Sequence, residues 1–521
     1  MMDAKYDAIV IGAGHNGLVC AAYLAKAGRR VLLAEASAVV GGAAITLELI
    51  PGFKVSTCAH LANMLHPKVV RELDLNRHGL EWAKSALPTT VLAEDGQHLT
   101  TSQNTVTGIA SGADSDLQYF PKFNQRLSSY ASIIKSFLDK TPPRLGTADW
   151  SDRSNLLKLG WAARRLGRDD MREFLRIVGM NIADLLEEFF DSELLRGALA
   201  WDAVVGSNLG PRSPGSVLTY LYRLASQSER GLAYPKGGLG AVTAALAAAA
   251  RSSGAEIRAG SPVAKVLLQS DKVGGIRLES GEEVAAPVVI SGADPRRSFL
   301  RFVGSENLDT GFVRRVRNIR MKGVTAKVNF ALSALPAFSG LDAERTGGRL
   351  LIAPGIDYLE RAFNHSKYGE YSESPGMEIV IPSVHDNTLA PNGKHVMSVI
   401  VQYAPYDLRD DWDQSREQFT DCVIQCISRY ARGFSDSIEA CEVITPLDLE
   451  RDFRMSGGHW HHGEIAFDQF MMMRPMPGVS QYYTPVPGFY LCSAGCHPGG
   501  GVMGAAGMNA ARQVLATEVN A

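Results

Sequence analysis

The stretch that most constrains the fold is "YDAIVIGAGHNGLVCAAYLAKAGRRVLLAEA", residues 6–36. The apolar run from Ala8 to Ile11 is typical of a buried parallel strand. A glycine-rich turn and a helix ending at Gly28 follow, and Val31 to Leu33 predict a second strand. Because strand, turn, helix and strand fall in order within some thirty residues, the sequence predicts a βαβ unit of the Rossmann type.

Three glycines, Gly12, Gly14 and Gly17, form the G-x-G-x-x-G pattern between the first strand and the helix. The first allows the tight turn, the second lets a pyrophosphate approach the backbone, and the third lets the helix close onto the strand. The first helical amides, at His15 and Asn16, then point at that pyrophosphate. A glycine-rich turn that binds nothing is the alternative, and the complete βαβ context argues against it.

The residues after the second strand indicate which dinucleotide binds. Glu35 lies 23 residues after Gly12, where a carboxylate accepts hydrogen bonds from a ribose diol. No Arg or Lys follows closely, so a 2′-phosphate has no partner and NADP is disfavoured. Gly41 and Gly42 resemble the double glycine of FAD-binding oxidoreductases of the glutathione-reductase type, although the usual basic neighbour is missing. We therefore predict FAD rather than NAD.

A second glycine-dense stretch, "GCHPGGGVMGAAG", lies at residues 495–507, near the other end of the chain. No charged residue occurs between Arg474 and Arg512. Five prolines within this span break any helix of the ~20 apolar residues that a bilayer requires. The stretch must therefore be buried against another part of the protein.

Composition narrows the remaining choices. The net charge of -2 argues against a nucleic-acid partner, which would require a basic excess. Seven cysteines without a CxxC pair indicate a reducing compartment. The first strand begins by about Tyr6, which leaves no room for a signal peptide. We expect a cytoplasmic protein, or a mitochondrial one if the source is eukaryotic.

The order of patterns predicts an α/β protein in which a Rossmann-type FAD-binding domain is interrupted by a mixed α+β substrate domain. Residues 114–222 show helical periodicity, while "GVTAKVNFAL" and "HVMSVIVQYA" are strand-like. We expect five segments: FAD-binding parts at 1–70, 225–300 and 455–521, a mostly helical substrate or cap part at 71–224, and a second substrate part at 301–454.

This order resembles the phytoene-desaturase-like branch of the flavin-dependent, amine-oxidase-type oxidoreductases, from Tyr6 to Leu515. The motifs that carry the resemblance are the N-terminal stretch, "YPKGGLGAVTAALA", "HHGEIAFDQF" and "GFYLCSAGCHPGGGVMGAAGMNAA". The resemblance implies that the C-terminal glycine-rich loop and the last helix lie against the isoalloxazine ring of FAD. On this resemblance, the charge-free stretch is buried against the bound FAD.

The same resemblance assigns further FAD contacts. Amides near Val502, Met503 and Gly504 would face the pyrimidine carbonyl oxygens, where a helix N-terminus stabilises negative charge on the ring. Gly495 would pack near the ribityl-pyrophosphate, and Val263 would offer backbone groups to the adenine.

Candidate catalytic residues are histidines. Carotene desaturases carry D-x-G-P shortly after the double glycine, whereas this chain has "VSTCAH", residues 55–60, which argues against a carotene substrate. His60 is a candidate proton acceptor over the ring, because imidazole titrates near neutral pH; the alternative is a histidine satisfied by local backbone.

Other histidines are close to the expected flavin. His462 in "GGHWHHGE" is assigned to the substrate pocket or to a structural role, and His497 either bonds flavin or substrate or holds its loop. His459, His461 and His462 have no fourth ligand at convincing spacing, so no metal site is predicted.

With one dinucleotide loop, the favoured reaction is dehydrogenation of a moderately large, mostly apolar organic molecule, forming a C=C bond. Dioxygen, a quinone or another external acceptor would take the electrons. Three alternatives remain open. The reaction could run in reverse and saturate a double bond, or the enzyme could be an amine oxidase that attacks a C–N bond. The third alternative is a non-catalytic lipid or protein binder similar to Rab GDP-dissociation inhibitors.

Two basic clusters allow peripheral contact with anionic lipid: Arg164, Arg165 and Arg168, and a run at residues 314–322. Solvated helix faces are the alternative explanation. Neither the substrate, the oligomeric state nor covalent attachment of the flavin follows from the sequence.

Overall fold

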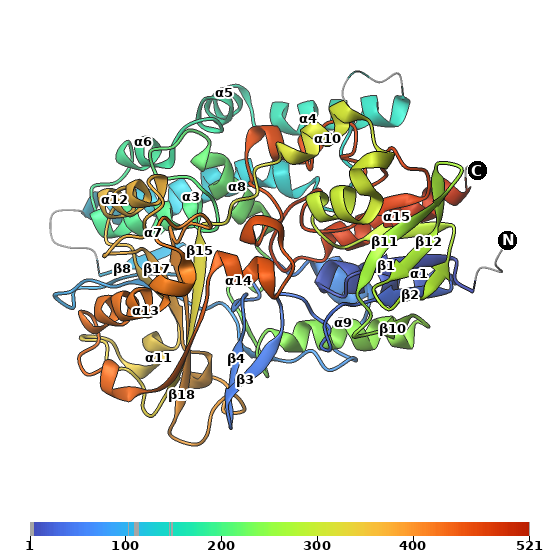
Figure 1. Ribbon diagram of the computed structural model, residues 1–521. Coiled ribbons are helices and arrows are strands. Elements are labelled where there is room, and N and C mark those ends of the chain that lie inside the picture. Colours follow the sequence, from blue (N-terminus) through green and yellow to red (C-terminus); the bar gives the residue numbers. More distant parts are fainter. Residues whose placement is uncertain (1–4, 103, 109–113, 145, 147–148, 520–521) are drawn as a thin grey trace.

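A five-stranded parallel sheet organises the half of the molecule that holds both chain ends (Figure 1). The computed structural model describes residues 5–102, 104–108, 114–144, 146 and 149–519. The sheet takes strands from the first, middle and last parts of the chain, in the order β10 (Glu256–Arg258), β2 (Val31–Ala34), β1 (Ala8–Ile11), β14 (Val288–Ser291) and β20 (Phe489–Leu491). The fold is the predicted α/β, Rossmann-type one.

Helix α1 (His15–Lys26) follows β1 and packs between α9 (Gly240–Ser252) and the last helix, α15 (Ala505–Val519). The contact between α1 and α15 is close: a Cβ added at Gly507 would lie 2.1 Å from the carbonyl oxygen of Asn16. Figure 1 shows the red C-terminal helix beside the blue N-terminal unit. The charge-free C-terminal stretch is therefore buried against the start of the chain.

A small antiparallel sheet lies next to the nucleotide-binding sheet, with strands β11 (Val263–Gln269), β12 (Lys272–Leu278) and β13 (Glu283–Ala285).

The other half is built on an eight-stranded mixed sheet. Its order is β19 (Ile438–Ile444), β15 (Thr325–Leu332), β18 (His395–Gln402), β17 (Met377–Val380), β16 (Arg349–Ile352), β6 (Thr89–Val91), β7 (Leu99–Ser102) and β8 (Thr105–Thr107). The last three strands come from the range 71–224, so this range, expected to be mostly helical, also extends the substrate-side sheet.

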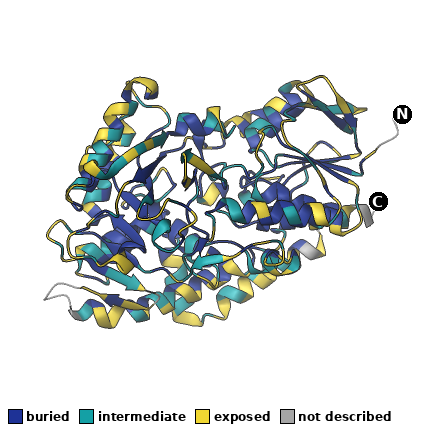
Figure 2. Cartoon of the chain, turned by 90° about the horizontal axis from the view of Figure 1, so that it is seen from below, coloured by how far each residue is buried: buried dark blue, intermediate teal, exposed yellow. Residues whose placement is uncertain are grey.

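Several helices lie between the strands of this sheet in the chain. They are α3 (Asp114–Lys135), α4 (Trp150–Arg164), α5 (Arg168–Ile177), α6 (Ile182–Glu187), α7 (Glu193–Val204), α8 (Ser216–Ser226), α12 (Ile356–Lys367) and α13 (Trp412–Ser428). Of these, α3 and α7 contact the strands β8 and β6, respectively. Figure 2 shows buried residues running through both halves, with exposed residues on the outer faces. No helix within the described ranges combines the length and the apolar character needed to cross a bilayer.

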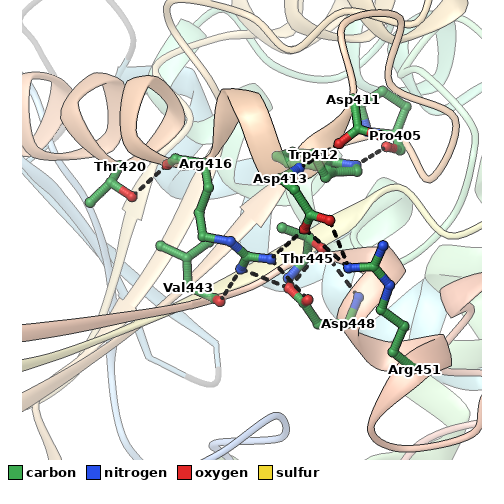
Figure 3. A network of polar contacts seen from close by, with 10 residues as sticks. All are labelled: Pro405, Asp411, Trp412, Asp413, Arg416, Thr420, Val443, Thr445, Asp448 and Arg451. Carbon is green, nitrogen blue, oxygen red and sulfur yellow. Dashed lines mark hydrogen bonds and ion pairs between the residues drawn. The ribbon is translucent and has the colours of Figure 1, made fainter.

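A polar network ties α13 to the short helix α14 (Pro446–Arg451) (Figure 3). Arg416 donates to both carboxylate oxygens of Asp448, at 2.8 and 2.9 Å. Asp448 also forms a capping box with Thr445, which satisfies the first amides of α14. The network fixes the end of α14 and thus the following segment, residues 452–455, which lines the cavity described next.

Candidate active site

A cavity of about 400 Å³ lies at the carboxyl ends of β1 and β2, where Rossmann folds bind dinucleotides. Its wall includes eight of the residues predicted to bind FAD: Gly12, Gly14, His15, Asn16, Gly17, Glu35, Gly42 and Val263. Side chains from residues 292–302 and 452–462 complete it.

The glycine-rich turn leaves its backbone open toward this cavity. A Cβ on Gly14 would meet no atom within 4 Å, whereas a Cβ on Gly17 would lie 1.9 Å from the carbonyl oxygen of Gly12. Gly17 thus closes the helix onto the strand, and Gly14 faces open space. Nε2 of His15 and Oδ1 of Asn16 are buried at the same place without a partner. An open backbone edge with unpaired polar atoms fits the pyrophosphate of FAD.

Glu35 is held in place by the turn itself. Its Oε2 accepts a hydrogen bond from the amide of Ala13 at 2.6 Å, and its Oε1 accepts one from the amide of Ser37 at 2.8 Å. A carboxylate has about four lone-pair positions, so both oxygens can still accept from a ribose diol.

The remaining predicted FAD contacts lie around the cavity rather than on its wall. Gly41 donates its amide to the carbonyl of Ala13 at 2.8 Å and so pins the double glycine to the turn. Gly495 is buried against Pro295. Within the C-terminal loop, Val502 reaches a cavity wall, whereas Met503 and Gly504 do not.

A second cavity, of about 160 Å³, continues the first. The two share four lining residues: His15, Ala43, Trp460 and Ala494. The second cavity has an apolar part and a wall of polar and charged side chains, among them His60, Asp202, Arg223, Glu378 and His461.

His60 lies on the wall of this second cavity, but both of its ring nitrogens have protein partners. Nε2 is 3.0 Å from Oε1 of Glu378, and Nδ1 is 2.7 Å from Nζ of Lys327. Burial, reinforced by the nearby Lys327 charge, lowers the pKa of His60 to about 4. The ring is therefore neutral near pH 7, and the partners assign its proton to Nε2, facing Glu378.

The groups beside His60 are buried and coupled by charge. Burial lowers the pKa of Lys327 to about 7. Burial by itself would raise the pKa of Glu378, but the adjacent Arg349 guanidinium and the bond from His60 outweigh it and hold the pKa well below its ordinary value. Arg349 donates to Glu378 at 2.7 Å and to Asp202 at 2.6 Å. The wall is thus a connected network in which the carboxylate of Glu378 joins the guanidinium of Arg349 to the neutral ring of His60.

The other histidines divide between the two cavities. His462 lines the FAD cavity with Nδ1 unpaired, and burial lowers its pKa to about 4. His461 lines the second cavity, also with Nδ1 unpaired. His497 lines neither; its Nε2 is 2.8 Å from the carbonyl oxygen of Phe137, an arrangement that holds its loop. Within the described ranges, no cluster of three or more potential ligands could hold a metal ion.

Sequence reasoning did not single out Lys327, Arg349, Glu378, Asp202 or Arg223. A usable signal exists for three of them. Lys327, Arg349 and Glu378 each occur in a short strand whose residues are all buried. A charge in such a strand requires a partner, so three of them in one sheet indicate a shared polar site.

An FAD cradle that adjoins a second cavity with a charged wall is the arrangement expected of an FAD-dependent oxidoreductase. The chain belongs to the family of flavin-containing amine oxidoreductases, whose model matches residues 17–515.

Relatives agree with this assignment. Pyridine nucleotide-disulfide oxidoreductase domain-containing protein 2 of Rattus norvegicus is 36% identical, over 98% of this chain and 93% of that protein. The neurosporene-forming phytoene desaturase of Rhodobacter capsulatus is 27% identical over 55% of this chain and 54% of its own. A putrescine oxidase variant has the same fold, with a TM-score of 0.64, 13% identity and 99% of each chain covered.

Proposed function

We propose that the protein is an FAD-dependent dehydrogenase that removes a hydride and a proton from a mostly apolar organic molecule and forms a C=C bond. The observation that carries this proposal is the second cavity, which adjoins the FAD cavity through four shared residues. The relative named as a phytoene desaturase supports C=C formation over other flavin chemistry.

The apolar part of the second cavity holds the substrate skeleton. Leu61, Met64, Val205, Ile400 and Ile465 line it. Removing such a skeleton from water is favourable by ~25 cal/mol per Å² of apolar surface, so these contacts bind and orient the substrate beside the ring.

Bound FAD supplies the acceptor for a hydride equivalent, and dioxygen, a quinone or another external acceptor closes the cycle. The proton leaves toward the charged wall. His60 accepts it if one of its present partners, Lys327 or Glu378, yields; His461 has an unpaired Nδ1 and is the second acceptor. Both histidines are neutral near pH 7, which a proton acceptor requires.

Oxidation of an amine is the second candidate function. Tyr222 and Trp460 line the second cavity, and aromatic faces attract cationic nitrogen. This candidate uses the same FAD site and differs in the bond that is broken.

Anaerobic mixing of the purified, FAD-loaded protein with terpenoids, polyenes, phenolic compounds and amines tests the proposal. We expect loss of the visible flavin absorbance with a compound whose carbon skeleton can be dehydrogenated, and a product lighter by two hydrogens. Bleaching by amines alone would replace the C=C assignment with amine oxidation.

A further inference from the structure

Arg223, on α8, lies on the wall of the second cavity beside two carboxylates, and it donates a hydrogen bond to neither. Its Nε is 3.1 Å from Oδ1 of Asp202, and its Nη2 is 3.7 Å from Oε2 of Glu378. Neither contact has the geometry of a hydrogen bond, and no other hydrogen bond from this guanidinium is found in the part of the chain that the structure describes. The side chain is 20% exposed. An arginine has five N–H donors, and leaving them unpaired in a half-buried site is unfavourable.

Arg349 makes the contrast clear, because it faces the same two carboxylates. It is 2% exposed and donates directly to Glu378 and Asp202. Glu378 also accepts from Nε1 of Trp201 at 2.9 Å. The carboxylates are therefore already engaged without Arg223, and its donors remain for a ligand.

We propose that Arg223 binds a carboxylate at one end of the substrate, so that the substrate is an amphipathic organic acid rather than a hydrocarbon. The planar guanidinium fork matches a carboxylate in a bidentate pair, which fixes orientation as well as position. Beyond that end, Val205 and Ile400 provide an apolar wall for the rest of the molecule. This inference rests on the proposed function, since it takes the second cavity as the substrate site.

Ligands of equal length test the preference for a carboxylate. Octanoate, 1-octanol and octylamine are titrated into the FAD-loaded protein, with calorimetry and the perturbation of the flavin spectrum as readouts. We expect octanoate to bind about tenfold more tightly than 1-octanol, since a charge-assisted pair is the difference between them. Equal affinities, or tighter binding of octylamine, would overturn the assignment.

Variants locate the effect on one side chain. R223Q is expected to bind octanoate about tenfold more weakly and to bind 1-octanol with unchanged affinity. R223K is expected to recover part of the lost octanoate affinity. R251Q, at an exposed position near the end of α9, is the matched control and should change neither. FAD content reports folding. If R223Q does not fold, R223K and the wild-type ligand series still decide.

The two proposals fail in different ways. The panel is extended with saturated and unsaturated organic acids. Selective octanoate binding without bleaching by any compound of this extended panel would contradict the dehydrogenase and leave the acid site standing. Bleaching by neutral compounds, with no effect of R223Q on any affinity, would contradict the acid site and leave the dehydrogenase standing.

A separate observation concerns the outer face of α4. Trp150, Leu157 and Trp161 are 74%, 67% and 65% exposed. Their spacing of seven and four residues places them on one side of the helix. Large apolar side chains exposed in one stripe are unusual on a soluble protein and mark a contact surface.

Charge identifies what this surface contacts. Residues 150–177 carry seven basic residues, Arg153, Lys158, Arg164, Arg165, Arg168, Arg172 and Arg176, against four acidic ones, in a chain of net charge -2. Arg176 among them is paired with Glu173 and Glu188. One of the acidic residues, Asp152, is buried and bonded to Arg144. We infer that α4 docks on an anionic lipid surface, with tryptophans at the depth of the headgroups and basic side chains on the phosphates.

The other basic run, at residues 314–322, lacks the exposed apolar stripe. No large apolar side chain of this run is exposed, and its last two basic residues pair with acidic ones, Arg320 with Asp468 and Lys322 with Asp407. The lipid contact is therefore assigned to α4.

Sedimentation with vesicles of phosphatidylcholine, alone or mixed with phosphatidylglycerol, tests the assignment. We expect binding to the anionic vesicles only, weakened by salt, and reduced about tenfold in W150S/W161S and in R164Q/R165Q. Y368S, which removes an equally exposed aromatic residue elsewhere, is the control. Binding that none of these variants changes would overturn the inference, as would a dimer that W150S/W161S dissolves.

Discussion

The two joined cavities are built by opposite means. The FAD cavity is shaped at its turn by backbone, where Gly12, Gly14 and Gly17 leave no side chain in the way. The second cavity is shaped by side chains, in which Arg349, Glu378 and their partners hold one another in place. The first is therefore damaged by adding an atom, and the second by removing one. Each of the following changes tests that contrast.

Glu378→Gln should have the largest effect on stability. It removes the carboxylate that joins Arg349 to His60 and leaves a buried guanidinium poorly compensated. Breaking a buried pair from one side costs about 3–5 kcal/mol. The shift of the urea midpoint at neutral pH measures this cost, and a loss below ~1 kcal/mol would show that the carboxylate does not stabilise the wall.

Gly17→Ala should have the second-largest effect on stability. Its Cβ would lie 1.9 Å from the carbonyl oxygen of Gly12, so α1 must move away from β1. We expect a loss of about 1–3 kcal/mol and a colourless protein. Gly28→Ala is the control, because that Cβ meets nothing within 4 Å and costs only the strain of a positive φ. Equal FAD content in the two variants would contradict the close packing at Gly17.

The third-largest effect should be the contribution of Lys327 to the dependence of stability on pH. The pKa of Lys327 in the folded protein is about 7, below its ordinary value of 10.5. Between these values the unfolded chain binds more protons, so stability rises with pH, by up to ~1.4 kcal/mol per unit. Lys327→Met should flatten the rise between about pH 8 and pH 10, whereas Lys272→Met, at an exposed site, should not. Parallel urea-midpoint profiles for both variants would contradict the prediction.

Gly14→Ala should have the smallest effect on stability and still weaken FAD binding. Its φ of -66° suits alanine, and its Cβ would enter open space. We expect a change within ~0.5 kcal/mol, together with an FAD affinity lowered about tenfold, because the methyl group occupies the path of the pyrophosphate. Thermal unfolding of the apoprotein and titration with FAD separate the two effects. Normal FAD binding would place the pyrophosphate elsewhere.

The same contrast explains how far the sequence could be interpreted. Backbone-built features follow from local patterns: the apolar run Ala8 to Ile11 is β1, and the fold and FAD were predicted from the motifs around it. The charged wall brings together His60, Lys327 and Glu378, which are separated by up to 318 residues and show no common motif. Nothing local records which distant partner satisfies a buried charge.

Short strands were missed for a related reason. β6, β7 and β8 are three or four residues long, too short for alternation to stand out beside long amphipathic helices. Their pairing with β16 is set by tertiary contact. His60 shows the same limit at the level of a single residue, since the sequence singled it out but did not indicate its two partners.

The packing of Gly507 against Asn16 has a consequence for synthesis. The first helix cannot bury its face toward α15 until residues 505–519 have left the ribosome, because that helix provides the surface. The nucleotide pocket therefore stays incomplete until long after α1 has been made. A chain that lacks residues 505–519 would therefore be long and yet unable to retain its coenzyme.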